Sequence, residues 1–156
     1  DEEWGQWKFA RGGELDPSAA VSAVNALGQL EFKDVIAGAK PEEEGKPVVV
    51  TAETFDNLIY TLHIGKRKGS DEYLLNVNVS GEPPRERPPE KGEKPEDKER
   101  RDKDFAETRK RLELRIARDK ARSAWTYIVD AKQVAPLLKP RSDMVRKPQP
   151  QNDRKQ

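Results

Sequence analysis

The chain contains no cysteine, only one histidine and no long uninterrupted run of apolar residues. The absence of cysteine excludes disulfides, thiolate nucleophiles and cysteine-ligated metals. The longest apolar runs cover three or four residues, far short of the roughly 20 that cross a bilayer, so this sequence holds no membrane span and no signal peptide. The chain starts at Asp1 without a methionine, and we therefore expect that an N-terminal segment able to act as an anchor has been removed.

Charged residues are abundant, at 38% of the chain against 33% for apolar residues. This average is typical of disordered proteins, yet the apolar residues concentrate in 4–80 and 105–138, which is enough for one thin core. The charges are also polarised, because residues 1–80 carry a net −6 and residues 105–156 a net +8. We interpret the two halves as attracting each other within one fold. The alternative is that the basic end contacts phosphate or an anionic membrane.

The start of the chain predicts a short strand followed by a helix. Alternating aromatic residues within Trp4–Phe9 indicate the strand. The helix is predicted over 17–28, because Asp16 can accept hydrogen bonds from the first amides and Pro17 suits the first helical position. The narrow apolar stripe of this helix comprises Ala20, Val21, Val24 and Leu27.

A three-stranded antiparallel meander is the strongest β signal in the chain. Val48–Ala52 and Leu58–Ile64 are rich in β-branched and other apolar residues. Asp56-Asn57 between them predicts a tight turn, because both residue types tolerate positive φ. The third strand, 73–79, alternates, and its predicted inward residues are Tyr73, Leu75, Val77 and Val79.

Residues 83–104 consist only of proline, glycine and charged residues. Five prolines, one glycine and sixteen charges cannot bury enough surface to offset the cost of ordering, so 83–97 is predicted to be a flexible, extended linker. Strong helix formers follow and predict a long, mainly solvated charged helix over 98–122. The rest of the chain predicts a fourth strand at 125–129, a short helix at 131–138 and a disordered tail at 146–156.

These elements predict an α+β fold: an antiparallel sheet of about four to five strands packed against one or two helices, with the long charged helix in an insertion. The folded domain comprises 4–80 and 124–145. The linker and the charged helix, which precede the last strand, interrupt this domain.

His63 is the first residue to consider for acid–base or metal chemistry. Its strand parity places it on the face opposite Leu62 and Ile64, and there is no cysteine or second histidine to complete a transition-metal site. No serine sits in a glycine-flanked elbow that would suit a Ser–His–acid triad. Glu42–Glu44, in the charged loop Lys40–Pro47, offers too few donors for calcium. We therefore predict no enzymatic activity, no catalytic residue, no metal and no cofactor.

The turn Gly65–Gly69 could bind an anion through its three cations, but it lacks the spacing of a phosphate loop and joins two strands. A second basic pattern is a stripe in the long helix. Its arginines are spaced by four, three and four residues, which places them on one flank. The predicted interaction surface comprises Arg111, Arg115, Arg118, Arg122 and Trp125.

The stripe can bind phosphate backbones, and it can equally pair with Glu107, Asp119 or the acidic half of the chain. No cluster of base-stacking aromatic residues accompanies the stripe, so nucleic acid is not the favoured partner.

Several hydrophobic motifs occur in a characteristic order. They are Trp7-Lys8-Phe9, Leu15-Asp16, Ala26-Leu27-Gly28-Gln29-Leu30, Leu62-His63-Ile64-Gly65, Tyr73–Val79, Trp125–Val129, Val134, Leu137-Leu138 and Arg141-Ser142-Asp143. Together they resemble the uncharacterised bacterial family known as domain of unknown function 4340, outside residues 83–122. The resemblance implies a repeated α+β module in membrane-anchored proteins outside the cytoplasm, some of them associated with ABC-type transport components linked to gliding motility. It implies no enzymatic activity and no functional residues.

Three functions follow as hypotheses. The first is a non-catalytic interaction or scaffolding module of a larger membrane-anchored protein, exported to the periplasm or another extracytoplasmic space. Its partners would be proteins, including components of an ABC-type transport complex, and its contact with the membrane would run only through the removed N-terminal segment. The alternative is a binder of nucleic acid or anionic surfaces through the basic helix 109–122. The third is a hydrolase centred on His63. The sequence leaves the oligomeric state open.

Overall fold

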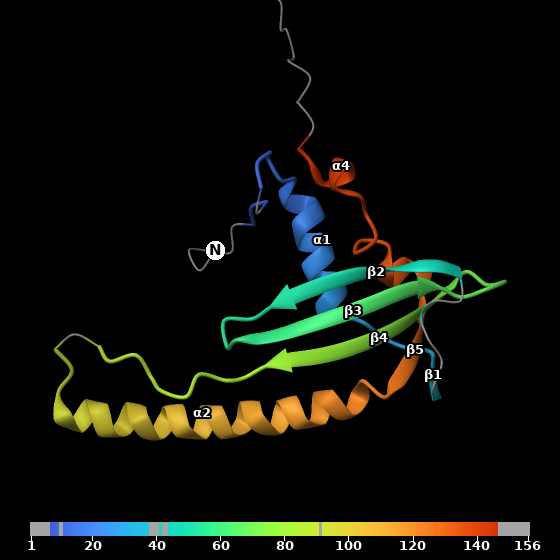
Figure 1. The fold of residues 1–156 in the computed structure, drawn as a ribbon. Helices are drawn as coiled ribbons and strands as arrows, with labels where there is room; N and C mark the ends of the chain where they lie inside the picture. The colour runs from blue at the N-terminus through green and yellow to red at the C-terminus, as the bar shows by residue number, and fades with distance from the viewer. Residues whose placement is uncertain (1–6, 10, 38–40, 42–43, 91, 147–156) are drawn as a thin grey trace, which may run out of the picture. The chain divides into compact units, whose positions relative to one another are not determined.

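The computed structural model describes residues 7–9, 11–37, 41, 44–90 and 92–146. It shows the predicted α+β class: a five-stranded antiparallel sheet, in the order β1-β5-β4-β3-β2, with a long helix packed against it (Figure 1). The elements in chain order are α1 (Pro17–Gly28), β1 (Asp34–Ala37), β2 (Glu44–Glu53), β3 (Leu58–Lys66), β4 (Glu72–Gly81), α2 (Pro95–Arg122), β5 (Trp125–Asp130), α3 (Ala131–Val134) and α4 (Arg141–Met144).

The chain divides into two compact units. One contains the residues up to Glu31 together with those from Asp130 onward, and the other is Phe32–Val129. The second unit holds α2 and nearly all of the sheet.

The β2–β3 hairpin forms as predicted. The two strands pair antiparallel, with Val50 opposite Leu62. Asn57 in the turn has a φ of 60°, the left-handed conformation that asparagine tolerates better than most residues. Leu58, Leu62 and Ile64 on the predicted inward face of β3 are all buried.

The third predicted strand is present as β4, but its burial differs from the expected alternation. Leu75 and Val79 are buried as expected, whereas Leu74, on the other face, is fully buried as well. Leu74 lies opposite Gly65 of β3, where a β-carbon would collide with the Pro41 carbonyl. The chain therefore covers both faces of the sheet at this point.

The edges of the sheet differ from the sequence prediction. β1 was not predicted, and it pairs with the predicted fourth strand, β5, with Val35 opposite Tyr127. β2 begins at Glu44, so the prediction of a loop is wrong for 44–47, which pairs with β3 through a register shift between Glu44 and Val48. Glu44 pairs with Lys66 of β3, so this stretch joins the sheet although its charged, proline-containing sequence is atypical of a strand. Residues 38–40 and 42–43 lie outside the described residues.

The charged helix forms as α2 and begins three residues earlier than predicted. Pro95 occupies the first turn, where its missing N–H costs no hydrogen bond. Acidic residues in the first turn and basic residues in the last complement the helix dipole. Ile116 is buried, and α2 packs against β4. The first half of α2 runs past the end of the sheet (Figure 1).

Segment 82–94, of which 82–90 and 92–94 are described, connects β4 to α2, and its described residues lie alongside that helix (Figure 1). Most of the predicted linker therefore has an extended course, and 95–97 belongs to the helix instead. The flexibility expected for this linker stays a prediction.

In the first unit, α1 has the predicted bounds. Asp16 Oδ1 accepts hydrogen bonds from the amides of Ser18 and Ala19 at 2.8 and 3.4 Å. The predicted apolar stripe is partly wrong, because Val21 and Val24 are exposed and the buried residues are Ala19 and Ala20. The buried face is thus lined by alanines, which a pattern weighted toward large side chains does not detect.

The predicted N-terminal strand is absent over residues 7–9, and residues 4–6 lie outside the described residues. Without a partner strand, two alternating aromatics do not make a strand. Phe9 instead lies 4.2 Å from the Arg141 guanidinium. The predicted helix 131–138 is shorter, as α3, and is followed by turns and by α4. Of the predicted tail, only Arg146 is described, and its amide donates to the Glu14 carbonyl at 2.9 Å.

Within the described part of the chain, no helix has the length and apolar character needed to cross a membrane.

Candidate binding surface on helix α2

The predicted arginine stripe lies on the second half of α2, where it surrounds a buried carboxylate. Asp119 is one of two buried residues of the helix. Its carboxylate lies 3.6 Å from Arg115 Nε, 3.5 Å from Arg118 Nε and 3.3 Å from Arg122 Nη1. Three of the four predicted arginines therefore share a single counter-charge, and the group stays net positive.

Tyr60 of β3 connects this cluster to the sheet. Its hydroxyl donates a hydrogen bond to Asp119 Oδ2 at 3.2 Å, and the Arg115 guanidinium lies 5.7 Å from the centre of its ring. Burial raises the pKa of Tyr60, an effect that Arg115 opposes and Asp119 reinforces. The phenol therefore stays protonated at neutral pH and remains a donor to the carboxylate.

The exposure of these side chains shows which way the cluster is directed. The Asp119 side chain is 10% exposed, whereas Arg115, Arg118 and Arg122 are 52%, 65% and 58% exposed. The carboxylate anchors the arginines from below, and much of each guanidinium remains at the surface. A guanidinium carries five donors in a planar fork, so this flank can accept an external carboxylate or phosphate as well.

The other two predicted residues lie at the ends of this surface. Arg111 is exposed and donates to Thr108 Oγ1 at 3.1 Å. Trp125 is 44% exposed and begins β5 immediately after the helix. Its carbonyl, like that of Ser123, accepts a hydrogen bond from Asn76 Nδ2. Asn76 thus fixes the turn that separates the helix from Trp125.

A second charged cluster, which the sequence did not predict, joins segment 82–94 to the first half of α2. Arg87 donates to Glu93 at 2.8 Å and to Asp102 at 2.9 Å. Arg101 pairs with Glu90 and, at 3.4 Å, with Glu93. We call these five residues the ion-pair latch. The side chains of Arg87 and Glu93 are only 16% and 7% exposed.

The ion pairs of the latch shift the pKa values of Arg87, Glu90 and Arg101. Hydrogen bonds to Glu93 and then Asp102 raise the pKa of Arg87. The hydrogen bond from Arg101 lowers the pKa of Glu90. Arg87 and Glu90 are therefore charged at neutral pH.

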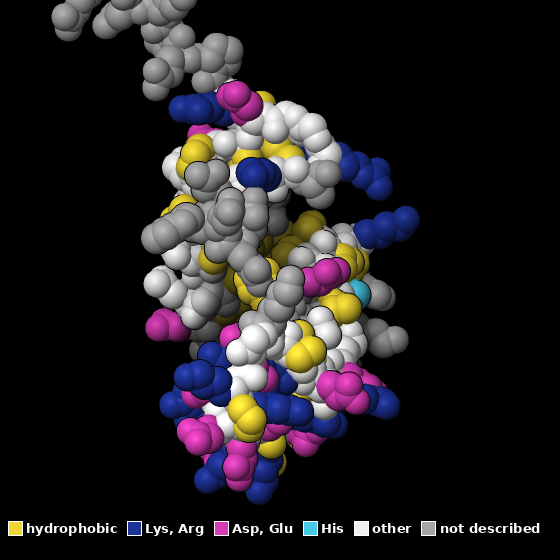
Figure 2. Space-filling model, turned by 90° about the vertical axis from the view of Figure 1, so that its left-hand side faces the viewer, with side chains coloured by type: hydrophobic (Ala, Val, Ile, Leu, Met, Phe, Trp, Pro, Cys, Tyr) yellow, Lys and Arg dark blue, Asp and Glu magenta, His cyan; other side chains and the backbone are white. Residues whose placement is uncertain are grey.

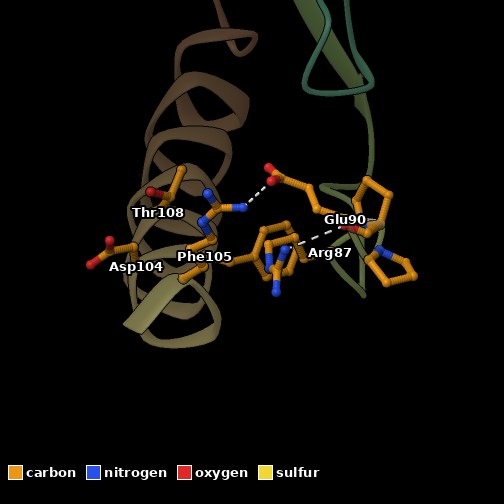
Figure 3. Close-up of a pocket in the computed structure, with 8 residues that line it drawn as sticks. Arg87, Glu90, Asp104, Phe105 and Thr108 are labelled. Atoms are coloured by element: carbon orange, nitrogen blue, oxygen red, sulfur yellow. Dashed lines mark hydrogen bonds and ion pairs between the residues drawn. The ribbon is translucent and has the colours of Figure 1, made fainter. Parts of the chain in front are cut away.

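An open groove of about 550 Å³ lies beside the latch. Figure 3 shows Phe105 extending from α2 toward the segment that carries Arg87 and Glu90. Phe105 is half-buried there, with Pro88 and Pro89 among the lining residues. Both arginines that line the groove already pair with carboxylates of the latch. Their charges are therefore balanced within the protein, and they give no indication of a bound anion.

The remaining sequence candidates show no assembled site. His63 is half-buried on β3, between Val49 and Asn76 of the neighbouring strands. No group of three histidine or acidic residues in the described ranges could hold a metal ion. In the turn after β3, Arg67 pairs with Glu72 at 2.8 Å, which lowers the pKa of Glu72 and offsets part of the positive charge. Of Glu42–Glu44, the first two lie outside the described residues.

Comparison of the chain with protein-family models, with curated proteins and with solved structures finds no match. The resemblance to the uncharacterised bacterial family therefore stays a prediction.

Proposed function

We propose that this chain is a non-catalytic interaction module that binds an acidic segment of a protein partner through the arginine flank of α2, Arg111, Arg115, Arg118 and Arg122. The observation that carries this proposal is the sharing of one buried carboxylate by three half-exposed guanidiniums. Such an arrangement holds the arginines in place on a rigid helix and leaves donors for bidentate pairing with carboxylates.

A protein partner fits this surface better than a nucleic acid. From Arg111 to Arg122 the flank extends for only about 16 Å, at about 1.5 Å per residue. Asp104 and Glu107 lie one to two turns before Arg111 and would repel a phosphate backbone that continued along the helix. Discrete carboxylates on a short segment avoid that repulsion. Binding of nucleic acid or another anionic surface is the second candidate, which the same net positive charge supports.

Fluorescence anisotropy with a labelled oligoglutamate peptide tests the proposal, with single-stranded DNA as the competing probe. The variant R111Q/R118Q removes two exposed charges and spares the Arg115–Tyr60 contact. Its matched control, R100Q/K103Q, removes two exposed charges from the first half of the same helix. We expect the peptide to lose affinity for the first variant and to keep it for the control.

Equal losses in the two variants would mean that the helix attracts anions without a defined site. Tighter binding of DNA than of peptide, with a steep salt dependence, would favour the second candidate. Circular dichroism of each variant checks that the fold is retained.

We further propose, on the family resemblance alone, that the module belongs to a membrane-anchored protein outside the cytoplasm, with transport components among its partners. Fractionation of cells that carry the full-length protein tests this. Recovery of the protein in the cytosolic fraction would contradict it.

A further inference from the structure

The second half of α2 has an exposed apolar side as well as its arginine flank. Leu114 lies two positions before the buried Ile116, and two residues turn a helix by about 200°, so the two side chains point in nearly opposite directions. Leu114 is 65% exposed, more than any other large hydrophobic residue of this helix. Ala117 and Ala121 follow it by three and seven residues and are also exposed. We call Leu114, Ala117 and Ala121 the apolar row.

The apolar row borders the arginine flank. Arg111 precedes Leu114 by three residues and Arg118 follows it by four, and residues at these spacings are neighbours on the surface of a helix. The ion pairs with Asp119 draw Arg118 and Arg122 toward the buried side of the helix, away from Leu114. The arginines therefore do not cover the apolar row, and a partner that binds the flank meets both kinds of side chain.

The charge of this part of the helix indicates the chemistry of that partner. Residues 109–122 carry seven basic and two acidic side chains. A second copy of this chain would place the same positive surface against itself, and like charges would oppose the contact. A phosphate backbone would satisfy the arginines but would leave Leu114 against polar groups. Charge complementarity together with the apolar row thus favours a partner that has carboxylates beside apolar side chains.

We infer that the acidic segment bound by the arginine flank is an amphipathic helix, whose acidic residues contact the arginines and whose apolar residues contact Leu114, Ala117 and Ala121. This inference rests on the proposed function. The apolar row and the arginine flank run side by side along α2, for about 10 and 16 Å. A helix presents an apolar and a charged row on adjacent flanks. A strand alternates its side chains between two faces and offers a single row to each.

Two acidic peptides of identical composition test this inference. In the first, about 18 residues long, glutamates and leucines fall on adjacent flanks of a helix. In the second, the same residues are permuted so that the leucines are spread around the helix. Fluorescence anisotropy measures the binding of each peptide to the unmodified chain. We expect the first to bind about tenfold more tightly, which corresponds to the burial of roughly one leucine side chain.

The variant L114Q separates the apolar row from the arginines. Because Leu114 is exposed, the substitution should leave the fold intact, which urea denaturation verifies. We expect L114Q to lose most of the tenfold preference for the first peptide. The matched control A106Q places the same side chain at an exposed position in the first half of α2, and it should keep the preference.

The possible results distinguish this inference from the proposed function. If the chain binds oligoglutamate through its arginines but binds the two peptides equally, the inference is overturned and the proposed function stands. The same conclusion follows if L114Q keeps the preference. If R111Q/R118Q binds the first peptide as tightly as the unmodified chain does, the arginines are not used and both are overturned. A preference that is lost in L114Q and kept in A106Q supports the amphipathic helix.

Discussion

The two halves of α2 are both highly charged, yet different forces hold them. In the second half, Ile116 and Asp119 are buried and the helix packs against β4. In the first half, ion pairs to segment 82–94 and the half-buried Phe105 supply the contacts. Figure 2 shows basic and acidic side chains intermixed over the surface of α2. Composition alone therefore does not determine how a charged helix is stabilised; the surface opposite each turn does.

The largest expected effect comes from the packed half. I116A should lower the free energy of unfolding by about 2–4 kcal/mol, since it removes buried methyl and methylene groups and leaves a cavity. Urea denaturation followed by circular dichroism measures this loss. F105A in the other half should change the global stability much less, because Phe105 is only half-buried and lines an open groove with Pro88 and Pro89. Equal losses for the two variants would show that the two halves of α2 contribute equally to the stability of the fold.

Salt should loosen the first half alone. The Debye length falls from about 10 Å at 0.1 M to 3 Å at 1 M ionic strength, which weakens the more exposed pairs of the latch, Arg101–Glu90 and Arg87–Asp102. Hydrogen exchange of 82–108 should become several-fold faster at high salt, and that of 112–122 should not change. If both halves respond alike, packing against the sheet does not protect the second half.

Acid should act on the same region. The pKa of Glu90 lies below its ordinary value because Arg101 donates a hydrogen bond to it. A depressed carboxyl pKa stabilises the folded state above the ordinary pKa, and this stabilisation is lost as the pH falls through the depressed value. We therefore expect the latch to hold at neutral pH and to open in acid. The side-chain resonances of Glu90 and Arg101 in an NMR titration would report this, with E90Q as the control that lacks the acid-dependent step.

The smallest effect is expected at an exposed pair between the two halves. Arg109 Nε lies 2.9 Å from Glu113, one helical turn away. E113A should change the free energy of unfolding by no more than about 0.5 kcal/mol, as is typical of helix pairs in water. A loss as large as that of I116A would show that this pair has a structural role beyond the surface.

Local patterns predicted the elements whose signals are local. The Asp16-Pro17 start defines α1, and Asp56-Asn57 defines the β2–β3 turn. The spacing of the arginines placed them on one flank of α2. In each case the decisive interactions connect residues no more than about four positions apart.

The features that were missed depend on contacts between distant parts of the chain. β1 has four residues, too few for a periodic signal, and it forms because β5 offers an edge. Pairing of the arginines with Asp119 was one of the predicted alternatives, but the burial of this carboxylate beside Tyr60, 59 positions away in sequence, was not predicted. The latch arises because segment 82–94 lies alongside the helix, a path that its mixed charges did not specify.

The out-and-back course of 82–122 has a consequence for how this protein can vary. Because the outgoing segment and the returning helix lie side by side, the projecting tip can become longer or shorter without a change in the sheet. Deleting seven residues from the first half of α2 would shorten the helix by about 10 Å, at 1.5 Å per residue, and would turn it by only about 20°. About three extended residues removed from the outgoing segment would match that change. The length of the insertion can therefore change in steps of two helical turns while Ile116 still faces β4.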